Sequence, residues 1–213
     1  MIAMTLTGTL ADDATPGGRI FCPALDGLTA RQADLAFVIP RMDHNRVLRE
    51  SRRQGDWAAL LASDPFGSEA TLFRQLADAG YRGLTNWPSS ILLDGTLRQS
   101  MSTIPASPAF EYDFLARAKE SGFEAMAFFL SLDQARAALR TGLKKLVLHP
   151  GLLDVRTKES GAMVLGSLQR LIDAIRAEAK EVSIFAYTSA WHEASVPLST
   201  LAVDGLVWLE ADS

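Results

Sequence analysis

Eight short apolar segments, each followed by a polar, proline or glycine turn, constrain the fold of this chain more than any other feature. Apolar runs of about four to eight residues between turn signals are typical of strands buried in a parallel sheet. The intervals between them carry mostly helical patterns. We therefore predict one parallel (β/α)8 barrel, a TIM barrel, as a single domain over residues 1–213. The predicted strands are residues 19–25, 35–40, 57–62, 81–85, 123–130, 144–148, 183–187 and 205–209.

The segments around these strands set the details of the prediction. Residues 1–18 are rich in Thr, Asp and Gly, so we expect no strand there. We interpret residues 26–34 as a crossover too short for a long helix, and residues 43–54 as a polar helix. Glycines at the joints before three strands, Gly80, Gly122 and Gly142, are predicted to end the preceding helices.

The predicted barrel has one alternative fold, and it implies that part of its wall is uncovered. An open doubly wound sheet is the alternative, but no Gly-rich phosphate-binding motif follows the first predicted strand. No helix is predicted after the eighth strand, so part of the barrel wall lacks its usual cover. Exposed apolar surface of that kind tends to be buried by a second copy, and we expect a homodimer or a higher homo-oligomer. The alternative is that the N-terminal segment covers this wall.

Composition excludes several classes of function. The formal net charge of −4 and the pI near 5.4 argue against nucleic-acid binding, which needs a basic surface. No apolar run reaches the roughly 18 residues of a membrane span, and the first residues lack the pattern of a secretory signal. Cys22 is the single cysteine, so no intramolecular disulfide can form and a cytoplasmic location is expected.

The stretch from Leu84 to Arg98 is the strongest candidate for chemistry. A strand ends at Asn86, a proline turn follows, and a second turn precedes Arg98. In a parallel barrel the carboxyl ends of all strands converge on one mouth, where active sites lie. The polar residues that follow the predicted strands are Cys22, Asp26, Arg41, Asp43, His44, Ser63, Asp64, Asn86, Asp94, Arg98, Ser131, His149, Tyr187 and Glu210.

Several of these side chains have two interpretations. Arg98 could clamp a carboxylate or phosphate, or could be a solvated loop arginine that pairs with Asp94. His149 could be a general acid or base, or could bond to a strand-end carbonyl. Asp64 and Glu210 could orient other groups or hold Mg²⁺, although a Ser-Asp-Pro sequence is also an ordinary turn.

Other residues receive the plainer interpretation. Cys22 is expected to be a buried small residue more than a nucleophile. Trp87 and Trp191 either wall a pocket or pack, and His192 is expected to be a loop residue without a role. The basic side chains of the second helix, Arg46, Arg49, Arg52 and Arg53, are expected to form its solvated face.

At these same residues the chain resembles the phosphoenolpyruvate hydrolase-like TIM-barrel family. The matching motifs are Ala62-Ser63-Asp64-Pro65-Phe66, the segment from Gly80 to Ser89, Asp94-Gly95-Thr96-Leu97-Arg98, Glu111, and His149-Pro150-Gly151-Leu152. The chain also departs from the family: the glutamate soon after the Leu97-Arg98 motif is absent, and the segment after the second predicted strand is shorter than usual. A Gly-rich turn is missing after the first predicted strand, and Tyr187-Thr188-Ser189-Ala190 stands where the family has His-Gly-Gly-Pro.

The resemblance implies an enzyme that acts on a small anion like phosphoenolpyruvate or a keto acid. Arg98 would hold the anion, His149 would move protons, and Asn86 would donate to a developing oxyanion. Asp64 and Glu210 would orient groups or hold Mg²⁺. Ser63, Trp87, Ser89 and Tyr187 complete the expected substrate-binding set. The alternative is a catalytically inactive barrel that senses a ligand or binds a protein.

Overall fold

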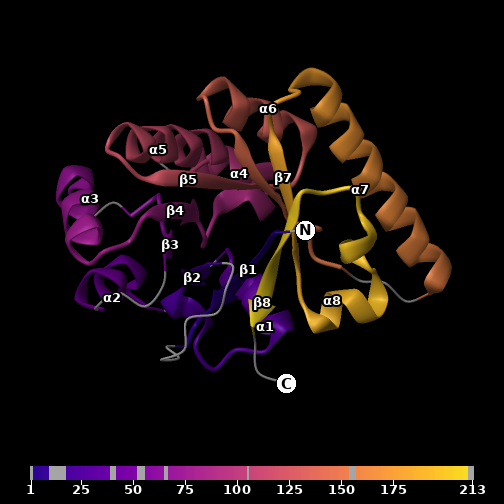
Figure 1. Cartoon of the computed structure of the whole chain (residues 1–213), viewed down its shortest axis with the longest axis horizontal. Coiled ribbons are helices and arrows are strands. Elements are labelled where there is room, and N and C mark those ends of the chain that lie inside the picture. Colours follow the sequence, from indigo (N-terminus) through magenta and orange to yellow (C-terminus); the bar gives the residue numbers. More distant parts are fainter. Residues whose placement is uncertain are drawn as a thin grey trace.

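The structure is a closed barrel of eight parallel strands in chain order, which confirms the predicted fold class (Figure 1). It is a computed structural model, and it describes residues 2–9, 18–38, 42–51, 56–64, 67–104, 106–153 and 157–210. The strands are β1 (Ile2–Thr7), β2 (Arg19–Phe21), β3 (Trp57–Leu60), β4 (Gly83–Asn86), β5 (Glu124–Phe129), β6 (Lys145–Leu148), β7 (Ser183–Thr188) and β8 (Gly205–Glu210).

Helices cover much of the outside of this barrel (Figure 1). The α-helices are α1 (Ala30–Ala36), α2 (His44–Glu50), α3 (Glu69–Asp78), α4 (Gly95–Met101), α5 (Pro108–Glu120), α6 (Leu132–Arg140), α7 (Lys158–Glu178) and α8 (Ala190–Ser195). Three single-turn 3-10 helices are η1 (Pro23–Leu25), η2 (Ser90–Leu92) and η3 (Leu198–Thr200). No helix in the described part of the chain is long and apolar enough to cross a membrane.

Two apolar cores follow from the alternation of side chains along the strands. On β3, Ala58 and Leu60 point outward into the core beneath the helices, whereas Trp57 and Ala59 point into the barrel. The inner core also contains residues from α1 and the residue after it, Phe37. The inner core therefore extends past the strand ends into the mouth, which α1 and Phe37 help to fill.

The count of eight strands was predicted correctly, but two of the individual assignments were wrong. Residues 2–7 form β1, although no strand was expected there. The apolar run at 35–40 is not a strand, because Ala30–Ala36 is helical and residues 39–40 lie outside the described part. Thr29 and Gln32 form a capping box that starts this helix, which replaces the crossover predicted at 26–34.

The joint glycines behave as predicted. Gly80, Gly122 and Gly142 have φ angles of 90°, 97° and 84°, in the left-handed region that favours glycine. Each follows a helix and precedes a strand, so the sequence signal for these αβ joints is confirmed.

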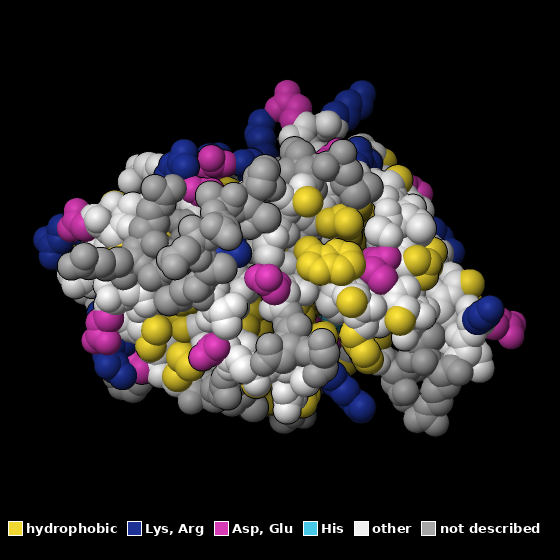
Figure 2. All heavy atoms as spheres, turned by 60° about the horizontal axis from the view of Figure 1, so that its bottom comes forward, with side chains coloured by type: hydrophobic (Ala, Val, Ile, Leu, Met, Phe, Trp, Pro, Cys, Tyr) yellow, Lys and Arg dark blue, Asp and Glu magenta, His cyan; other side chains and the backbone are white. Residues whose placement is uncertain are grey.

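The wall formed by β1 and β8 is partly uncovered. Within the described residues no helix follows β8, and its outward side chains Leu206 and Trp208 are only half-buried. Leu35 on α1 and Trp191 on α8 are also exposed, and both helices lie at the bottom of Figure 1. Figure 2 shows hydrophobic side chains gathered near the centre of the face seen from that side. The homodimer expected from an uncovered wall stays a prediction, to be checked by light scattering.

Candidate functional site

Strands β6 and β7, together with helix α8, place three ring side chains at the mouth. On β6, Val147 points into the barrel, so His149, two residues later, faces inward as well. Tyr187 follows Phe185 on β7 by the same alternation. The chain then caps α8 with Ser189, whose side chain accepts a hydrogen bond from the backbone of His192. His149, Tyr187 and His192 are all completely buried.

Asp34 on α1 is the group on which these three side chains converge. The Tyr187 hydroxyl donates to Asp34 Oδ1 at 3.2 Å. His192 Nε2 lies 3.2 Å from Oδ2, and His149 Nε2 lies 3.7 Å from Oδ1. We call Asp34, His149, Tyr187, Ser189 and His192 the mouth cluster.

Hydrogen bonds on the far side of each imidazole set its orientation. His149 Nδ1 accepts from the Gly151 backbone at 3.0 Å, so the ring proton is on Nε2, which faces Asp34. Within the described residues that Nε2 has no hydrogen-bond partner, because 3.7 Å is too long. His192 Nδ1 lies 2.9 Å from Ser189 Oγ.

Burial and charge shift the acidities of the mouth cluster in different directions. Burial alone would raise the pKa of Asp34, but the polar interaction with the two neighbouring imidazoles, His149 and His192, lowers it to about 2. Burial lowers the pKa of His149, and the neighbouring Asp34 offsets this only in part. Burial, together with the Asp34 charge, raises the pKa of Tyr187 well above its usual value. At neutral pH the cluster therefore holds an ionised Asp34, a neutral His149 and an un-ionised tyrosine.

Aromatic rings enclose the cluster. His149 stacks on Tyr187, with ring centroids 4.9 Å apart and an interplanar angle of 17°. Phe37 lies over the same site, with its centroid 4.7 Å from His149, 5.0 Å from Trp87 and 5.6 Å from Phe128. The residues that follow β4 and β6 thus meet on one side chain from the segment after α1.

A second buried carboxylate, Glu111, lies at the carboxyl end of β4. It accepts from Asn86 Nδ2 at 2.8 Å, from Ser89 Oγ at 2.5 Å, and from the Ser90 backbone and hydroxyl at 2.7 and 2.6 Å. Burial raises the pKa of Glu111, and these hydrogen bonds offset part of the rise. We call Asn86, Ser89, Ser90 and Glu111 the Glu111 cluster, which ties the loop after β4 to α5.

The predicted catalytic residues divide between these two clusters and the surface. His149 is in the mouth cluster. Asn86 is in the Glu111 cluster, where its amide donates to Ser89 and Glu111 and its oxygen accepts from the Phe128 backbone. That geometry leaves Asn86 no spare donor for an oxyanion.

The two predicted carboxylates lie apart from both clusters. Asp64 is half-buried and accepts from Asn45 on α2 at 3.1 Å, and Glu210 is exposed at the end of β8. Among the described residues no three His, Cys, Asp or Glu side chains group in a way that could hold a metal ion. The Mg²⁺ site considered at Asp64 and Glu210 stays a prediction.

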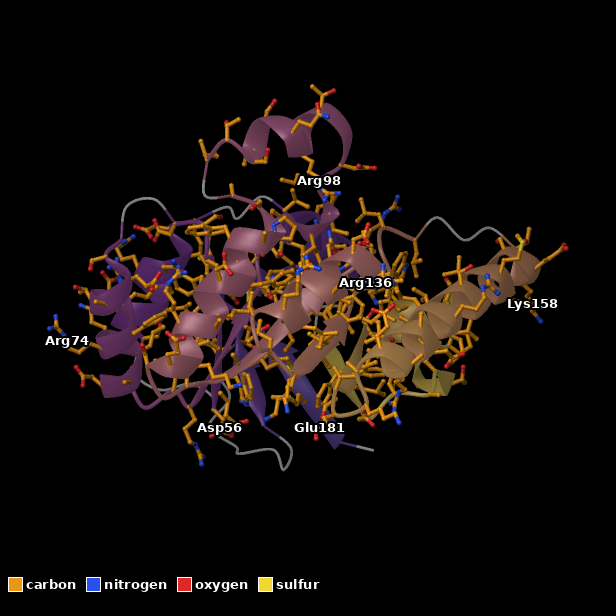
Figure 3. The ribbon with its side chains drawn as sticks, turned by 90° about the horizontal axis from the view of Figure 1, so that it is seen from above. Asp56, Arg74, Arg98, Arg136, Lys158 and Glu181 are labelled. Carbon is orange, nitrogen blue, oxygen red and sulfur yellow. The ribbon has the colours of Figure 1, made fainter. Side chains whose placement is uncertain are left out.

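The predicted substrate-binding residues are also spread over different places. Tyr187 is in the mouth cluster, Trp87 packs on Phe37, and Ser89 is bonded to Glu111. Ser63 is half-buried in the loop after β3. Arg98 is exposed on α4, a helix without buried residues that stands apart at the carboxyl end of the barrel (Figure 3). Arg41 lies outside the described residues.

Three members of the mouth cluster were missed, namely Asp34, Ser189 and His192. Asp34 was assigned to a crossover, and His192 was expected to be a loop residue without a role, whereas it lies on α8 with its Nε2 3.2 Å from Asp34 Oδ2. The Thr29-x-x-Gln32 capping box could have revealed the helix that carries Asp34. Ser189-x-x-His192 is a comparable signal for the start of α8. Cys22 is buried as expected, and burial raises the pKa of its thiol.

The fold and the mouth cluster define a parallel (β/α)8 barrel with a buried, polar, histidine-containing site at the carboxyl ends of its strands. The sequence family described as phosphoenolpyruvate hydrolase-like matches residues 31–187, and the chain belongs to this family. The match includes Asp34, His149 and Tyr187, while His192 follows just after it.

Two curated relatives have comparable similarity. The chain is 27% identical over 150 residues to the uncharacterized protein y4oT of Sinorhizobium fredii, covering 68% of this chain and 76% of that protein. It is 26% identical over 156 residues to the ToMV resistance protein Tm-1(GCR237) of Solanum lycopersicum, covering 70% of this chain. That alignment spans only 20% of the tomato protein.

Among solved structures, a putative phosphonomutase from Burkholderia cenocepacia J2315 has a similar fold. The TM-score is 0.50 at 14% sequence identity, with 99% of this chain and 87% of the other covered. At that identity the likeness supports the barrel fold and carries no information on the reaction.

Proposed function

We propose that the mouth cluster is the active site of an enzyme that acts on a small anion like phosphoenolpyruvate or a keto acid. The observation that carries this proposal is the convergence of His149, Tyr187 and His192 on one carboxylate group at the carboxyl end of the barrel. Phosphoenolpyruvate and keto acids carry a carboxylate, the same functional group that Asp34 presents to these side chains. Membership of the phosphoenolpyruvate hydrolase-like family supports the same class of substrate.

Within this proposal His149 moves the proton. Its Nδ1 accepts from the Gly151 backbone, so the Nε2 that faces the site carries the ring proton and can donate it to a bound anion, while the lowered pKa keeps the ring neutral at pH 7. The un-ionised Tyr187 donates a hydrogen bond, as it does to Asp34 here. Arg98 on the projecting α4 is the proposed outer contact for the anion, and Asp64 and Glu210 stay candidates for orienting groups.

Paired histidine substitutions test the proposal. Phosphate release from phosphoenolpyruvate, and turnover of pyruvate and oxaloacetate, are measured for the wild type, His149→Gln and His44→Gln. His44 is the matched control because it is also a buried histidine, bonded to the Ala59 carbonyl at 2.7 Å and absent from both clusters. Circular dichroism establishes that each variant is folded.

We expect His149→Gln to lose about 10²- to 10⁴-fold in kcat, the usual contribution of a general acid or base. His44→Gln should keep its kcat. Equal activity of His149→Gln and the wild type would reject His149 as the proton carrier. An absence of turnover with every one of these anions would reject the proposed substrate class.

A ligand-binding barrel without catalysis is the second candidate. The burial of all three donors favours it, because none of them is exposed to a substrate from solution in this structure. Calorimetric binding of a keto acid without any turnover would support this candidate. Turnover in the first assay would exclude it.

A further inference from the structure

We propose that the Asp34 carboxylate occupies the subsite for the carboxylate of a small ligand, and that α1 is a plug which the ligand displaces. This inference rests on the proposed function, since it assigns the mouth cluster to an anion. It adds which part of the anion is recognised and which element has to move.

The donors around Asp34 come from separate parts of the chain. His149 follows β6, Tyr187 is on β7 and His192 is on α8. Asp34 contacts them from α1, which lies far from all three in the sequence. Their polar atoms lie 3.2 to 3.7 Å from the two oxygens of one carboxylate. The three donors therefore form a carboxylate cradle that the barrel builds without α1.

Asp34 fills this cradle incompletely. The buried Nε2 of His149 lacks a hydrogen-bond partner among the described residues, and so does the buried Nε1 of Trp87. Both rings pack on Phe37, the residue after α1. Buried donors are almost always satisfied, so the unsatisfied Nε2 of His149 beside the Asp34 carboxylate indicates a place for a ligand oxygen. A free carboxylate, unlike Asp34, is not held back by a helix and can approach His149 within hydrogen-bond distance.

The contacts of α1 suit a displaceable element. Apart from Asp34, the buried side chains of α1 are alanines, and Leu35 is 61% exposed, whereas Phe37 after the helix is completely buried. One backbone hydrogen bond, from Ser89 N to Phe37 O at 2.7 Å, joins its carboxyl end to the loop after β4. A ligand that binds only the open state has its apparent affinity lowered by the fraction of open molecules. Removing the Asp34 carboxylate should therefore strengthen the binding of a small carboxylate.

The first experiment uses calorimetric titration of pyruvate into the wild type, Asp34→Ala, Asp34→Asn and Asp78→Ala. Asp78 is an exposed carboxylate on α3 and serves as the control. We expect Asp34→Ala to bind pyruvate at least tenfold more tightly than the wild type, Asp34→Asn to lie between them, and Asp78→Ala to equal the wild type. Acetate should raise the Tm of Asp34→Ala and leave that of Asp78→Ala unchanged.

The second experiment follows hydrogen exchange of the wild type and needs no variant. Saturating pyruvate should accelerate exchange of the backbone amides of residues 33–37, while the amides of β5 stay unchanged. Pyruvamide, which has no carboxylate, should have no effect. Protection of residues 33–37 by pyruvate, or weaker pyruvate binding by a folded Asp34→Ala, would overturn the proposal.

The outcomes separate this inference from the proposed function. Tighter pyruvate binding by Asp34→Ala without turnover by any variant would keep the carboxylate cradle and reject the enzyme. Turnover by the wild type together with weaker binding by Asp34→Ala would keep the enzyme and show that Asp34 is not a stand-in for the ligand.

Discussion

The carboxyl end of this barrel contains two buried carboxylates whose surroundings differ. Glu111 accepts four hydrogen bonds of 2.5 to 2.8 Å from an amide, two hydroxyls and a backbone amide. Asp34 has one phenol and one imidazole at 3.2 Å and a second imidazole at 3.7 Å. Both side chains are almost completely buried, with exposed fractions of 1% and 3%.

This difference indicates that the Glu111 carboxylate stabilises the fold, whereas the Asp34 carboxylate occupies a site where a ligand carboxylate can replace it. The hydrogen bonds of the Glu111 cluster are short, and all of its donors are used. Any rearrangement there would leave buried polar groups without hydrogen-bond partners. The mouth cluster consists of titratable rings at longer distances, and one ring nitrogen lacks a partner. Incomplete satisfaction of that kind is typical of a site that awaits another group. Three predictions test this contrast, and a fourth tests the role of Arg98 outside both clusters.

The largest effect is expected when the saturated carboxylate is removed. Glu111→Ala leaves Ser89, Ser90 and the Ser90 backbone without their acceptor inside the protein. We expect the free energy of unfolding to fall by about 3–5 kcal/mol in urea denaturation. Glu120→Ala, which removes an exposed carboxylate from the same helix, should stay within about 0.5 kcal/mol of the wild type. A small effect of Glu111→Ala would erase the contrast between the clusters.

The two carboxylates should also give opposite dependences on pH. The pKa of Asp34 is lowered from 3.8 to about 2, so its contribution is complete above pH 3.8 and is lost as the pH falls towards 2. This contribution amounts to about 2 kcal/mol. Burial raises the pKa of Glu111, so its contribution is complete below pH 4.5 and is lost as the pH rises through the raised pKa.

Urea denaturation between pH 2 and pH 6 measures these slopes. Relative to the wild type, Asp34→Asn should lose less stability as the pH falls from 4 to 2. Glu111→Gln should become relatively less unfavourable as the pH rises above 4.5. His149, His192 and Tyr187 face Asp34, and they are unchanged in the comparison of each variant with the wild type. Parallel curves for Asp34→Asn and the wild type would show that Asp34 is not held ionised by the imidazoles.

Two buried tyrosines offer a smaller test. The Tyr112 hydroxyl donates to the Phe128 carbonyl at 3.0 Å, whereas the Tyr187 hydroxyl donates to Asp34 at 3.2 Å. Tyr112→Phe should lower the free energy of unfolding by about 1 kcal/mol. Tyr187→Phe should lower it by less than about 0.5 kcal/mol, because its bond is longer than usual and Asp34 keeps His192. The reverse order in thermal unfolding would place Tyr187 among the structural groups.

Arg98→Lys is expected to have the smallest effect on stability, within about 0.5 kcal/mol, because α4 buries none of its residues. Its effect on anion binding decides its role. If Arg98 is the outer anchor, the planar guanidinium grips a carboxylate or phosphate in a way that lysine does not reproduce. Titration with phosphoenolpyruvate should then give about a 10- to 150-fold weaker affinity. Equal affinities would make Arg98 a surface residue.

The sequence predicted the fold better than it predicted the individual strands. Residues 57–60 and 145–148 read correctly because strands buried on both faces are continuously apolar. Residues 2–7 were missed because threonines interrupt the apolar pattern. The helix at Ala30–Ala36 was missed because the apolar run from Leu35 onwards carries the same signal in a buried helix as in a strand.

The site was predicted only in part for a different reason. His149 and Tyr187 follow strands, and strand ends converge in any parallel barrel, so position alone identified them. Asp34 reaches the mouth from a helix that crosses it, and His192 reaches it from the first turn of α8. The path of such segments depends on tertiary packing, which strand patterns do not encode. Asn86 was found for its position, but its role depends on Glu111, which lies 25 residues away.

The pairing of β1 with β8, which closes the barrel, has a consequence for the folding of the chain. Six residue pairs, from Ile2 with Gly205 to Thr7 with Glu210, join the two ends of the sequence. Ordering so long an intervening chain costs entropy before these pairs return any stabilisation, so we expect barrel closure to be a late step in folding. Until the barrel closes, the edges by which β1 and β8 pair expose backbone groups without partners, and these groups can pair with a strand from another chain. Aggregation during refolding should therefore depend more on substitutions in β1 than on equally conservative ones in α3.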